Sequence, residues 1–151
     1  MLQQNAPQEV IIDGEGAILG RLSTYVAKLL LSGKKVVIVN ADKIAVSGEP
    51  TMVISAYRRT VLGVKVHFSE KWRPKRSRSP VNIVRKAVRG MLPKNSKGRE
   101  ALSRLRVFIG VPRDFKGSNL VKLPSNMTVE KLTRSKYITL AEVSRQLGWS
   151  R

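Results

Sequence analysis

The sequence predicts an α/β fold built on a small, mainly parallel sheet, and three observations lead to this prediction. Two short apolar runs, at Glu9–Asp13 and at 35–40, have the length and the β-branched residues typical of strands. Between them, apolar residues recur at helical spacing. A strand, a helix and a strand within about thirty residues form a βαβ unit, in which the two strands lie parallel in one sheet.

The helix of this unit is expected to run from Gly20 to about Leu31 and to end at Ser32-Gly33. Its apolar positions recur at helical spacing: Leu22, Val26, Leu29 and Leu30. The strand that follows, at 35–40, is apolar on both of its faces. Such a strand is typical of the middle of a parallel sheet, where both faces are covered.

A helix and a loop are predicted next along the chain. Pro50 suits the first position of a helix, and residues 52–61 are expected to be helical. Residues 71–80 carry many cations and too few apolar side chains to pack. We therefore expect a cationic loop there.

Two further helices and a strand are predicted beyond this loop. Residues 80–89 are expected to be helical, with Gly90 as the C′ residue. The apolar face of this helix is formed by Val81, Val84 and Val88. Asn95 or Ser96 is expected to cap a short helix, and residues 105–109 are predicted to form a strand that returns to the same sheet.

The C-terminal part of the chain contains a capping box, Thr139 with Glu142, in front of a helical pattern that Gly148 stops. Residues 138–150 resemble the first helix and turn of helix-turn-helix DNA readers, but the chain stops at Arg151 without a recognition helix. A DNA-binding regulator is therefore a disfavoured alternative. The favoured interpretation is a capped amphipathic helix that packs three apolar side chains: Leu140, Val143 and Leu147.

Length and composition limit the possible classes of protein. A chain of 151 residues suits one domain with an appendage, and we expect a single α/β domain at 1–116, with a basic loop at about 69–80, and a C-terminal extension at 117–151. The absence of cysteine excludes disulfides and thiolate metal sites. Neither a membrane-spanning run nor a signal peptide is visible, so we expect a cytoplasmic protein that does not bind membranes.

The excess positive charge lies downstream of residue 57. Residues 1–57 contain five Lys and Arg against five acids, residues 58–116 contain eighteen against three, and the remainder contains six against two. The formal net charge is +19 and the isoelectric point is about 11.2, which favours a nucleic acid as the partner. The cations are spread over turns and several elements, as expected for contact with a folded RNA.

One glycine pattern raises the alternative of a nucleotide-binding enzyme. Gly14, Gly16 and Gly20 follow a strand and open a helix, and Asp42 lies where a dinucleotide fold places its ribose-binding acid. The glycine spacing departs from that motif, and Glu15 brings a negative charge toward the bound phosphates. A tight turn between strand and helix also favours glycine, so turn chemistry is the favoured interpretation.

No constellation for catalysis is visible. His67 is the only histidine and lies in the alternating stretch 64–68. Without cysteine or a second histidine, neither a metal cluster nor a histidine-based triad has supporting residues. We therefore expect no enzymatic activity, no cofactor, no metal site and no small-molecule substrate.

A further cationic pattern surrounds the turn Gly90-Met-Leu-Pro93, where two short helices are predicted to meet. Glu100 is the one acid in this stretch, whereas an ordinary solvated surface has interspersed acids. Lysine neutralises phosphate as a point charge, and arginine adds a planar fork that stacks on exposed bases. Six cations are expected to line one ridge of backbone phosphates: Arg85, Lys86, Arg89, Lys94, Lys97 and Arg99.

At these residues the chain resembles the universal large-subunit ribosomal protein L13 family. The similarity lies in Val88-Arg-Gly-Met-Leu-Pro-Lys-Asn95 and Leu105-Arg-Val-Phe-Ile-Gly110, and it extends upstream through Val37-Ile-Val-Asn-Ala-Asp-Lys43 to Ile12-Asp-Gly14. It covers about 10–110 in the same order. The basic stretch 73–80, the tail and the compact length are similar to archaeal members.

The resemblance implies a three-layer α/β/α fold on a small, mainly parallel, four-stranded sheet. It also implies a structural role in the large ribosomal subunit, where the protein binds and stabilises folded large-subunit rRNA beside neighbouring ribosomal proteins. Trp72 is expected either to stack on a base or to pin the loop to the body. The candidate rRNA-binding residues are Arg58, Arg59, Lys71, Trp72, Arg73, Lys75, Arg76, Arg78, Arg85, Lys86, Arg89, Lys94, Asn95, Lys97, Arg99, Arg104 and Arg106.

Overall fold

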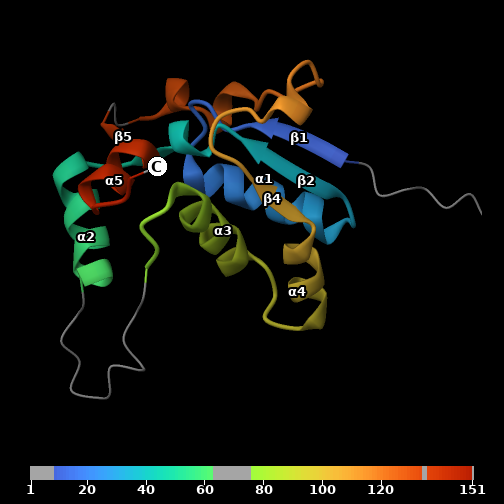
Figure 1. The fold of residues 1–151 in the computed structure, drawn as a ribbon, viewed down its shortest axis with the longest axis horizontal. Helices are drawn as coiled ribbons and strands as arrows, with labels where there is room; N and C mark the ends of the chain where they lie inside the picture. The colour runs from blue at the N-terminus through green and yellow to red at the C-terminus, as the bar shows by residue number, and fades with distance from the viewer. Residues whose placement is uncertain (1–8, 63–75, 134–135, 151) are drawn as a thin grey trace, which may run out of the picture.

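A computed structural model describes residues 9–62, 76–133 and 136–150 of the chain (Figure 1). It has a mixed α/β fold with a small, mainly parallel sheet, as the sequence predicts. The elements follow in the order β1 (Glu9–Asp13), α1 (Leu19–Leu31), β2 (Lys35–Val39), β3 (Ala45–Ser47), α2 (Pro50–Leu62), α3 (Pro80–Met91), α4 (Ser96–Ser103), β4 (Leu105–Val107), β5 (Tyr137–Thr139) and α5 (Leu140–Gln146).

The main sheet has the strand order β1-β2-β4, and both pairings are parallel. The expected βαβ unit is therefore present, and β2 is the central strand, as its apolar sequence predicts. β4 ends two residues before the predicted 105–109. The pairing nevertheless continues past its end, because the backbone N–H of Phe108 donates to the carbonyl oxygen of Ile38 at 2.8 Å.

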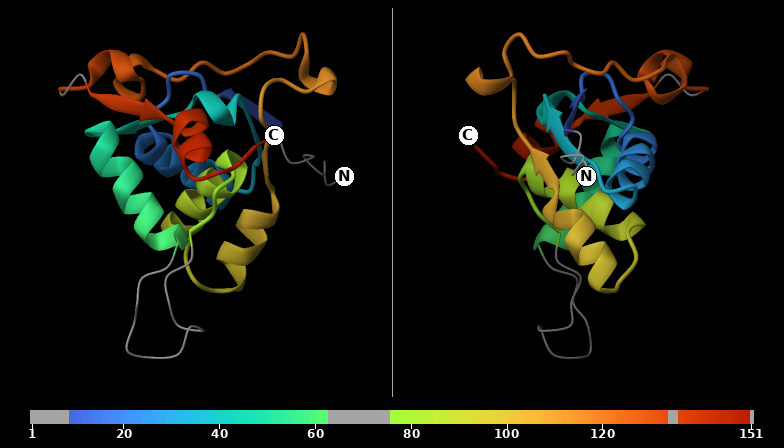
Figure 2. Two further views of the ribbon diagram at one scale, coloured as in Figure 1. Left: turned by 60° about the vertical axis from the view of Figure 1, so that its left-hand side comes forward. Right: turned by 90° about the vertical axis from the view of Figure 1, so that its right-hand side faces the viewer.

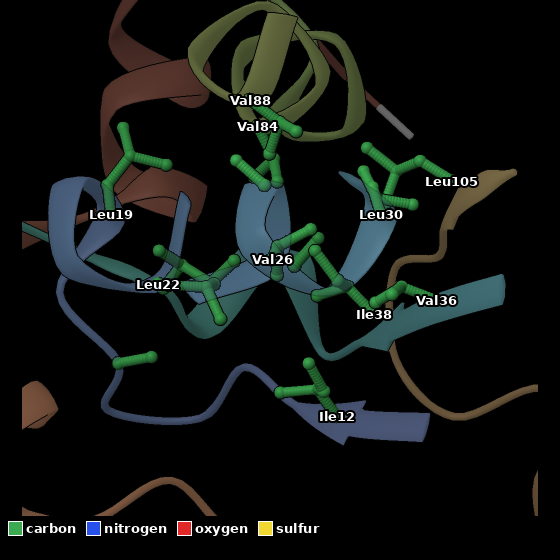
Figure 3. Close-up of a cluster of buried hydrophobic side chains, with 14 of the residues drawn as sticks. Ile12, Leu19, Leu22, Val26, Leu30, Val36, Ile38, Val84, Val88 and Leu105 are labelled. Atoms are coloured by element: carbon green, nitrogen blue, oxygen red, sulfur yellow. The ribbon is translucent and has the colours of Figure 1, made fainter. Parts of the chain in front are cut away.

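The main core lies between this sheet and the helices α1 and α3 (Figure 3). Val26 and Leu30 of α1 are completely buried, and so are Val84 and Val88 of α3. They meet Val36 and Ile38 of β2, so α1 and α3 cover the same face of the sheet. Two β2 residues point to the opposite face and are also buried: Val37 and Val39.

The C-terminal segment folds back onto the body through a second, two-stranded sheet. β5 pairs antiparallel with β3, and Val46 lies opposite Ile138. Leu140, at the start of α5, is completely buried in the main core. Val143 and Leu147 form a smaller core with residues of α2. α2 and α5 lie side by side, at the opposite end of the molecule from α4 (Figure 1), and Figure 2 shows the segment that follows β4 running along one side of the body.

The helix at the C-terminus is capped as expected, but only half of the capping box forms. The hydroxyl oxygen of Thr139 accepts from the backbone N–H of Glu142 at 3.4 Å. The carboxylate of Glu142 accepts instead from Arg145 and Gln146, at 2.9 Å and 3.1 Å. Gly148 has a φ of +79°, which suits its expected role in ending the helix.

Gly90 was expected to terminate the third helix, and this prediction was wrong. Gly90 lies inside α3, which continues to Met91. The helix ends because Pro93 disfavours the helical backbone in the residue before it. Leu92 accordingly has φ −92° and ψ 150°. Within the described part of the chain, no helix is long and apolar enough to span a membrane.

Candidate nucleic-acid interface

The turn that joins α3 to α4 is held by two local contacts. The side-chain oxygen of Asn95 accepts from the backbone N–H of Gly98 at 3.0 Å and so caps α4, as the sequence predicts. A Cβ atom on Gly98 would lie 1.8 Å from the carbonyl oxygen of Pro93. Only glycine allows this approach, which brings the start of α4 against the turn.

A concave surface of about 570 Å³ lies at this turn, and we call it the α3–α4 groove. Its apolar residues come from the turn and from α4. Its cations come from α3, from the turn and from α4, and among the described residues no acid lines it. The groove is lined by Lys86, Arg89, Gly90, Leu92, Pro93, Lys94, Gly98, Arg99 and Leu102.

The structure brings together most of the six cations predicted to form a ridge. Four of them line the α3–α4 groove, all exposed: Lys86, Arg89, Lys94 and Arg99. Arg85 lines an adjoining hollow of about 320 Å³ that shares Lys86 and Arg89 with the groove. Lys97 is exposed on the first turn of α4 but does not line either hollow.

Two predicted RNA-binding residues are engaged in protein contacts instead. Asn95 uses its side-chain oxygen for the α4 cap. Arg104 forms an ion pair with Glu100 at 2.8 Å, and its second terminal nitrogen donates to the carbonyl oxygen of Leu30 at 3.0 Å. These bonds join α4 to the C-terminal end of α1, so Arg104 has a structural role here.

Other predicted residues lie away from the groove. Arg58 and Arg59 of α2 line a separate hollow of about 530 Å³. Arg106 follows Leu105 on β4, so its side chain points to the sheet face opposite the main core. Arg78 is exposed just before α3. Four predicted RNA-binding residues lie outside the described residues: Lys71, Trp72, Arg73 and Lys75. His67 also lies outside them.

Arg76 is placed against an aromatic ring that the sequence reasoning did not single out. Its guanidinium carbon lies 4.8 Å from the centroid of the Tyr57 ring. Burial raises the pKa of the Tyr57 hydroxyl, and the nearby Arg76 charge opposes that shift. The available signal was the spacing of Val53, Tyr57 and Val61, which places Tyr57 on the apolar face of α2.

The glycine turn between β1 and α1 does not offer its backbone to a phosphate. The amides of Gly14, Gly16 and Ile18 donate to the carbonyl oxygens of Val39, Lys43 and Met127. The amides between them are also used within the protein: Glu15 donates to the Asp13 carboxylate, and Ala17 donates to the Gly14 carbonyl oxygen.

Asp42, the proposed ribose-binding acid, is engaged as well. Its carboxylate accepts from the backbone N–H of Gly110 at 3.2 Å. A Cβ atom on Gly14 would lie 2.9 Å from both the Val39 carbonyl oxygen and a side-chain carbon of Ile44. The geometry therefore supports turn chemistry and contradicts the nucleotide-binding alternative.

Comparison with known proteins gives one family. The family model for ribosomal protein L13 matches residues 7–114. A protein of Aeropyrum pernix named large ribosomal subunit protein uL13 is 54% identical over 150 residues, which are 99% of this chain and 96% of that protein. The protein of the same name from Saccharolobus solfataricus is 46% identical, over 99% of this chain and 99% of its own length. The one from Archaeoglobus fulgidus is 44% identical, over 92% of this chain and 87% of its own length.

Proposed function

This chain belongs to the ribosomal protein L13 family, and we propose that it is an archaeal-type structural constituent of the large ribosomal subunit. In this role it binds and stabilises folded rRNA through the α3–α4 groove. Its other partners are neighbouring large-subunit proteins, and its place is the cytoplasmic ribosome. The relatives that carry the large-subunit name match almost the whole length of the chain, which supports this assignment.

The observation that carries the rRNA-binding proposal is the convergence of cations from three segments on one concave surface. Arg89 projects from α3, Lys94 from the turn and Arg99 from α4, and all three line the groove. Cations on opposite walls neutralise phosphates that approach from different directions. This arrangement suits the irregular backbone of a folded RNA.

The body of the protein holds this cationic surface in place. Val84 and Val88 anchor α3 in the core, so Arg85 and Arg89 on its other face point outward. Gly98 and Asn95 fix α4 against the turn. Because the cations start from rigid elements, the ordering cost on RNA binding is confined to the side chains themselves.

We propose that the remaining predicted cations extend the surface beyond the groove. Three exposed arginines are proposed to contact rRNA beside the groove: Arg58 and Arg59 on α2, and Arg78 before α3. Arg106 is proposed to contact rRNA on the other face of the sheet. The predicted contacts of Lys71, Trp72, Arg73 and Lys75 also stay predictions. We leave Asn95 and Arg104 out of the surface, because the side-chain oxygen of Asn95 and the two terminal nitrogens of Arg104 are bonded to the protein.

We also propose the finer architecture, a three-layer α/β/α arrangement with a four-stranded sheet. The segment at Val121 supports a rudimentary fourth strand beside β1, since its N–H donates to the Ile11 carbonyl oxygen at 2.8 Å in a parallel bridge. Burial of Val37 and Val39 supports a layer on the second face. We also propose that the chain consists of an α/β domain at 1–116 and a C-terminal extension at 117–151. In this proposal the extension completes the core of the domain.

Sedimentation and binding measurements test the proposed function. In a cell lysate at high magnesium, the protein is expected to travel with large ribosomal subunits. Its affinity for large-subunit rRNA is expected to fall with salt, with a log–log slope of about −0.7 for each phosphate neutralised in single-stranded contacts. Free migration together with a slope near zero contradicts the proposal, and saturable NAD or ATP binding would restore the enzyme alternative.

A further inference from the structure

A further hollow, of about 310 Å³, is lined by residues of α2, of α3 and of the segment before α3. We propose that this hollow binds a single unpaired RNA base, stacked on the Arg76 guanidinium that Tyr57 supports. The proposal rests on the rRNA-binding function proposed above and adds a kind of contact that phosphate neutralisation does not supply. We call this place the Tyr57–Arg76 hollow, and its lining residues are Tyr57, Arg76, Ser77, Ile83, Lys86 and Ala87.

The stacking surface is already assembled in the protein alone. The Arg76 guanidinium carbon lies over the Tyr57 ring, 4.8 Å from its centroid, which is within the range of a cation–π contact. Arg76 is exposed, so its guanidinium is accessible from the hollow and from solvent. Unpaired RNA bases stack on aromatic rings and on the planes of arginine guanidinium groups.

The shape and chemistry of the hollow suit one base. Ile83 and Ala87 of α3 line it with apolar side chains, which suit the face of a planar base. Lys86 carries a positive charge at the same place, beside the expected position of the nucleotide's phosphate. A volume of about 310 Å³ lies at the lower end of small-ligand sites. A double helix does not enter such a space.

Tyr57 is fixed before any RNA arrives. Its ring packs against both the main core and the smaller core formed with α5. The tyrosine hydroxyl is neutral at physiological pH and does not repel a phosphate, and burial raises its pKa further. Because the ring packs against both cores and Arg76 already lies over its face, little conformational freedom is lost when a base binds.

The first test replaces the planar group and keeps its charge. Arg76→Lys is made in the full chain and compared with Arg113→Lys, an exposed arginine that does not line the hollow. The probe is large-subunit rRNA transcribed in vitro. Because stacking of one base contributes about 1–3 kcal/mol, the affinity of Arg76→Lys is expected to fall about tenfold. The salt slope is expected to stay unchanged, since the number of charges is the same.

The second test fills the hollow without changing any charge. Ala87→Met extends a half-buried side chain into the space, and Ala56→Met adds the same atoms to an exposed α2 position outside the hollow. Dimethyl sulfate and carbodiimide, which modify unpaired bases, report on the bound rRNA. The wild-type protein is expected to protect at least one base that Arg76→Lys and Ala87→Met both leave reactive, whereas the two control variants protect it.

The outcomes separate this proposal from the proposed function. Wild-type affinity in both Arg76→Lys and Ala87→Met overturns the base site while leaving rRNA binding intact. Reduced affinity without any base becoming reactive also overturns it, because the contact is then structural. A wild-type protein that shows no salt-dependent binding to rRNA contradicts the proposed function itself. Unchanged thermal midpoints by circular dichroism ensure that folded proteins are compared.

Discussion

The β1–α1 turn and the α3–α4 turn both depend on a glycine for close packing, yet they differ in what they present to solvent. In the first, the amides from Gly14 to Ile18 are all bonded to protein oxygens. In the second, Gly98 is also used for packing, against Pro93, but cationic side chains surround the turn. In both turns glycine serves close backbone approach. The capacity to bind a polyanion therefore depends on the side chains around the turn.

The largest expected effect is that of Gly98→Ala. The new Cβ would lie 1.8 Å from a backbone oxygen, so the turn or α4 has to move. Overpacking of this kind costs about 3 kcal/mol, and the thermal midpoint is expected to fall by about 10 °C. Thermal unfolding followed by circular dichroism measures this. A midpoint equal to that of the wild type would show that the turn is not held as tightly as the structure indicates.

The second prediction concerns side chains rather than glycines. Replacing Arg85 and Arg89 together by Ala removes two cations from the α3–α4 surface without touching the buried face of α3. Charge-assisted contacts contribute about 1.5–3 kcal/mol each, so rRNA affinity at low salt is expected to fall by at least about a hundredfold. The salt slope is expected to become shallower by about 1.4.

A matched control removes two cations from the neutral first third of the chain. Lys35 and Lys43 are both exposed, and Lys43 pairs with Glu15 beside the β1–α1 turn. Replacing both by Ala is expected to leave rRNA affinity within about twofold of the wild type, since neither lysine lines the groove. Equal losses in the two double variants would mean that net charge, and not the groove, determines binding.

These comparisons also show where sequence reasoning succeeds. β1 and α1 were predicted within one residue, because their apolar periodicity and flanking glycines are local signals. The cap of α4 was narrowed to Asn95 or Ser96 for the same reason, and Asn95 forms it. The end of α3 was predicted wrongly because two helix-ending signals, Gly90 and Pro93, lie close together. Pro93 determines the end, since it disfavours the helical backbone in Leu92.

The missed features depend on partners far away in the sequence. The pairing of β3 with β5 joins segments about ninety residues apart, and nothing in either three-residue strand specifies the other. Arg104 reads as one more cation in a basic run until its bond to the Leu30 carbonyl oxygen is seen. Tyr57 was missed as a support for Arg76 because the two residues lie far apart in the sequence and meet only in the folded chain.

The third prediction tests the glycine of the first turn. Gly14→Ala brings a Cβ to 2.9 Å from the Val39 carbonyl oxygen and from a side-chain carbon of the buried Ile44. Because these approaches are less close than the 1.8 Å at Gly98, the cost is expected to be smaller than there, about 2 kcal/mol. Urea unfolding measures it. Affinity for rRNA at a temperature where the variant is folded is expected to match the wild type, and a large loss would place RNA at this turn.

The smallest expected effect compares the surroundings of the two turns, because it uses one glycine from the helix next to each turn. Gly90 in α3 and Gly20 in α1 are exposed helical glycines with open space where a Cβ would be. Alanine at either position is expected to stabilise the fold by about 0.5–1 kcal/mol in urea unfolding. Gly90 lines the α3–α4 groove and Gly20 does not. Gly90→Ala is therefore expected to weaken rRNA binding while it stabilises the protein, whereas Gly20→Ala stabilises it with unchanged affinity. If Gly90→Ala binds rRNA as the wild type does, the RNA backbone does not pass over this residue, and the contact has to be assigned to the cationic rim alone.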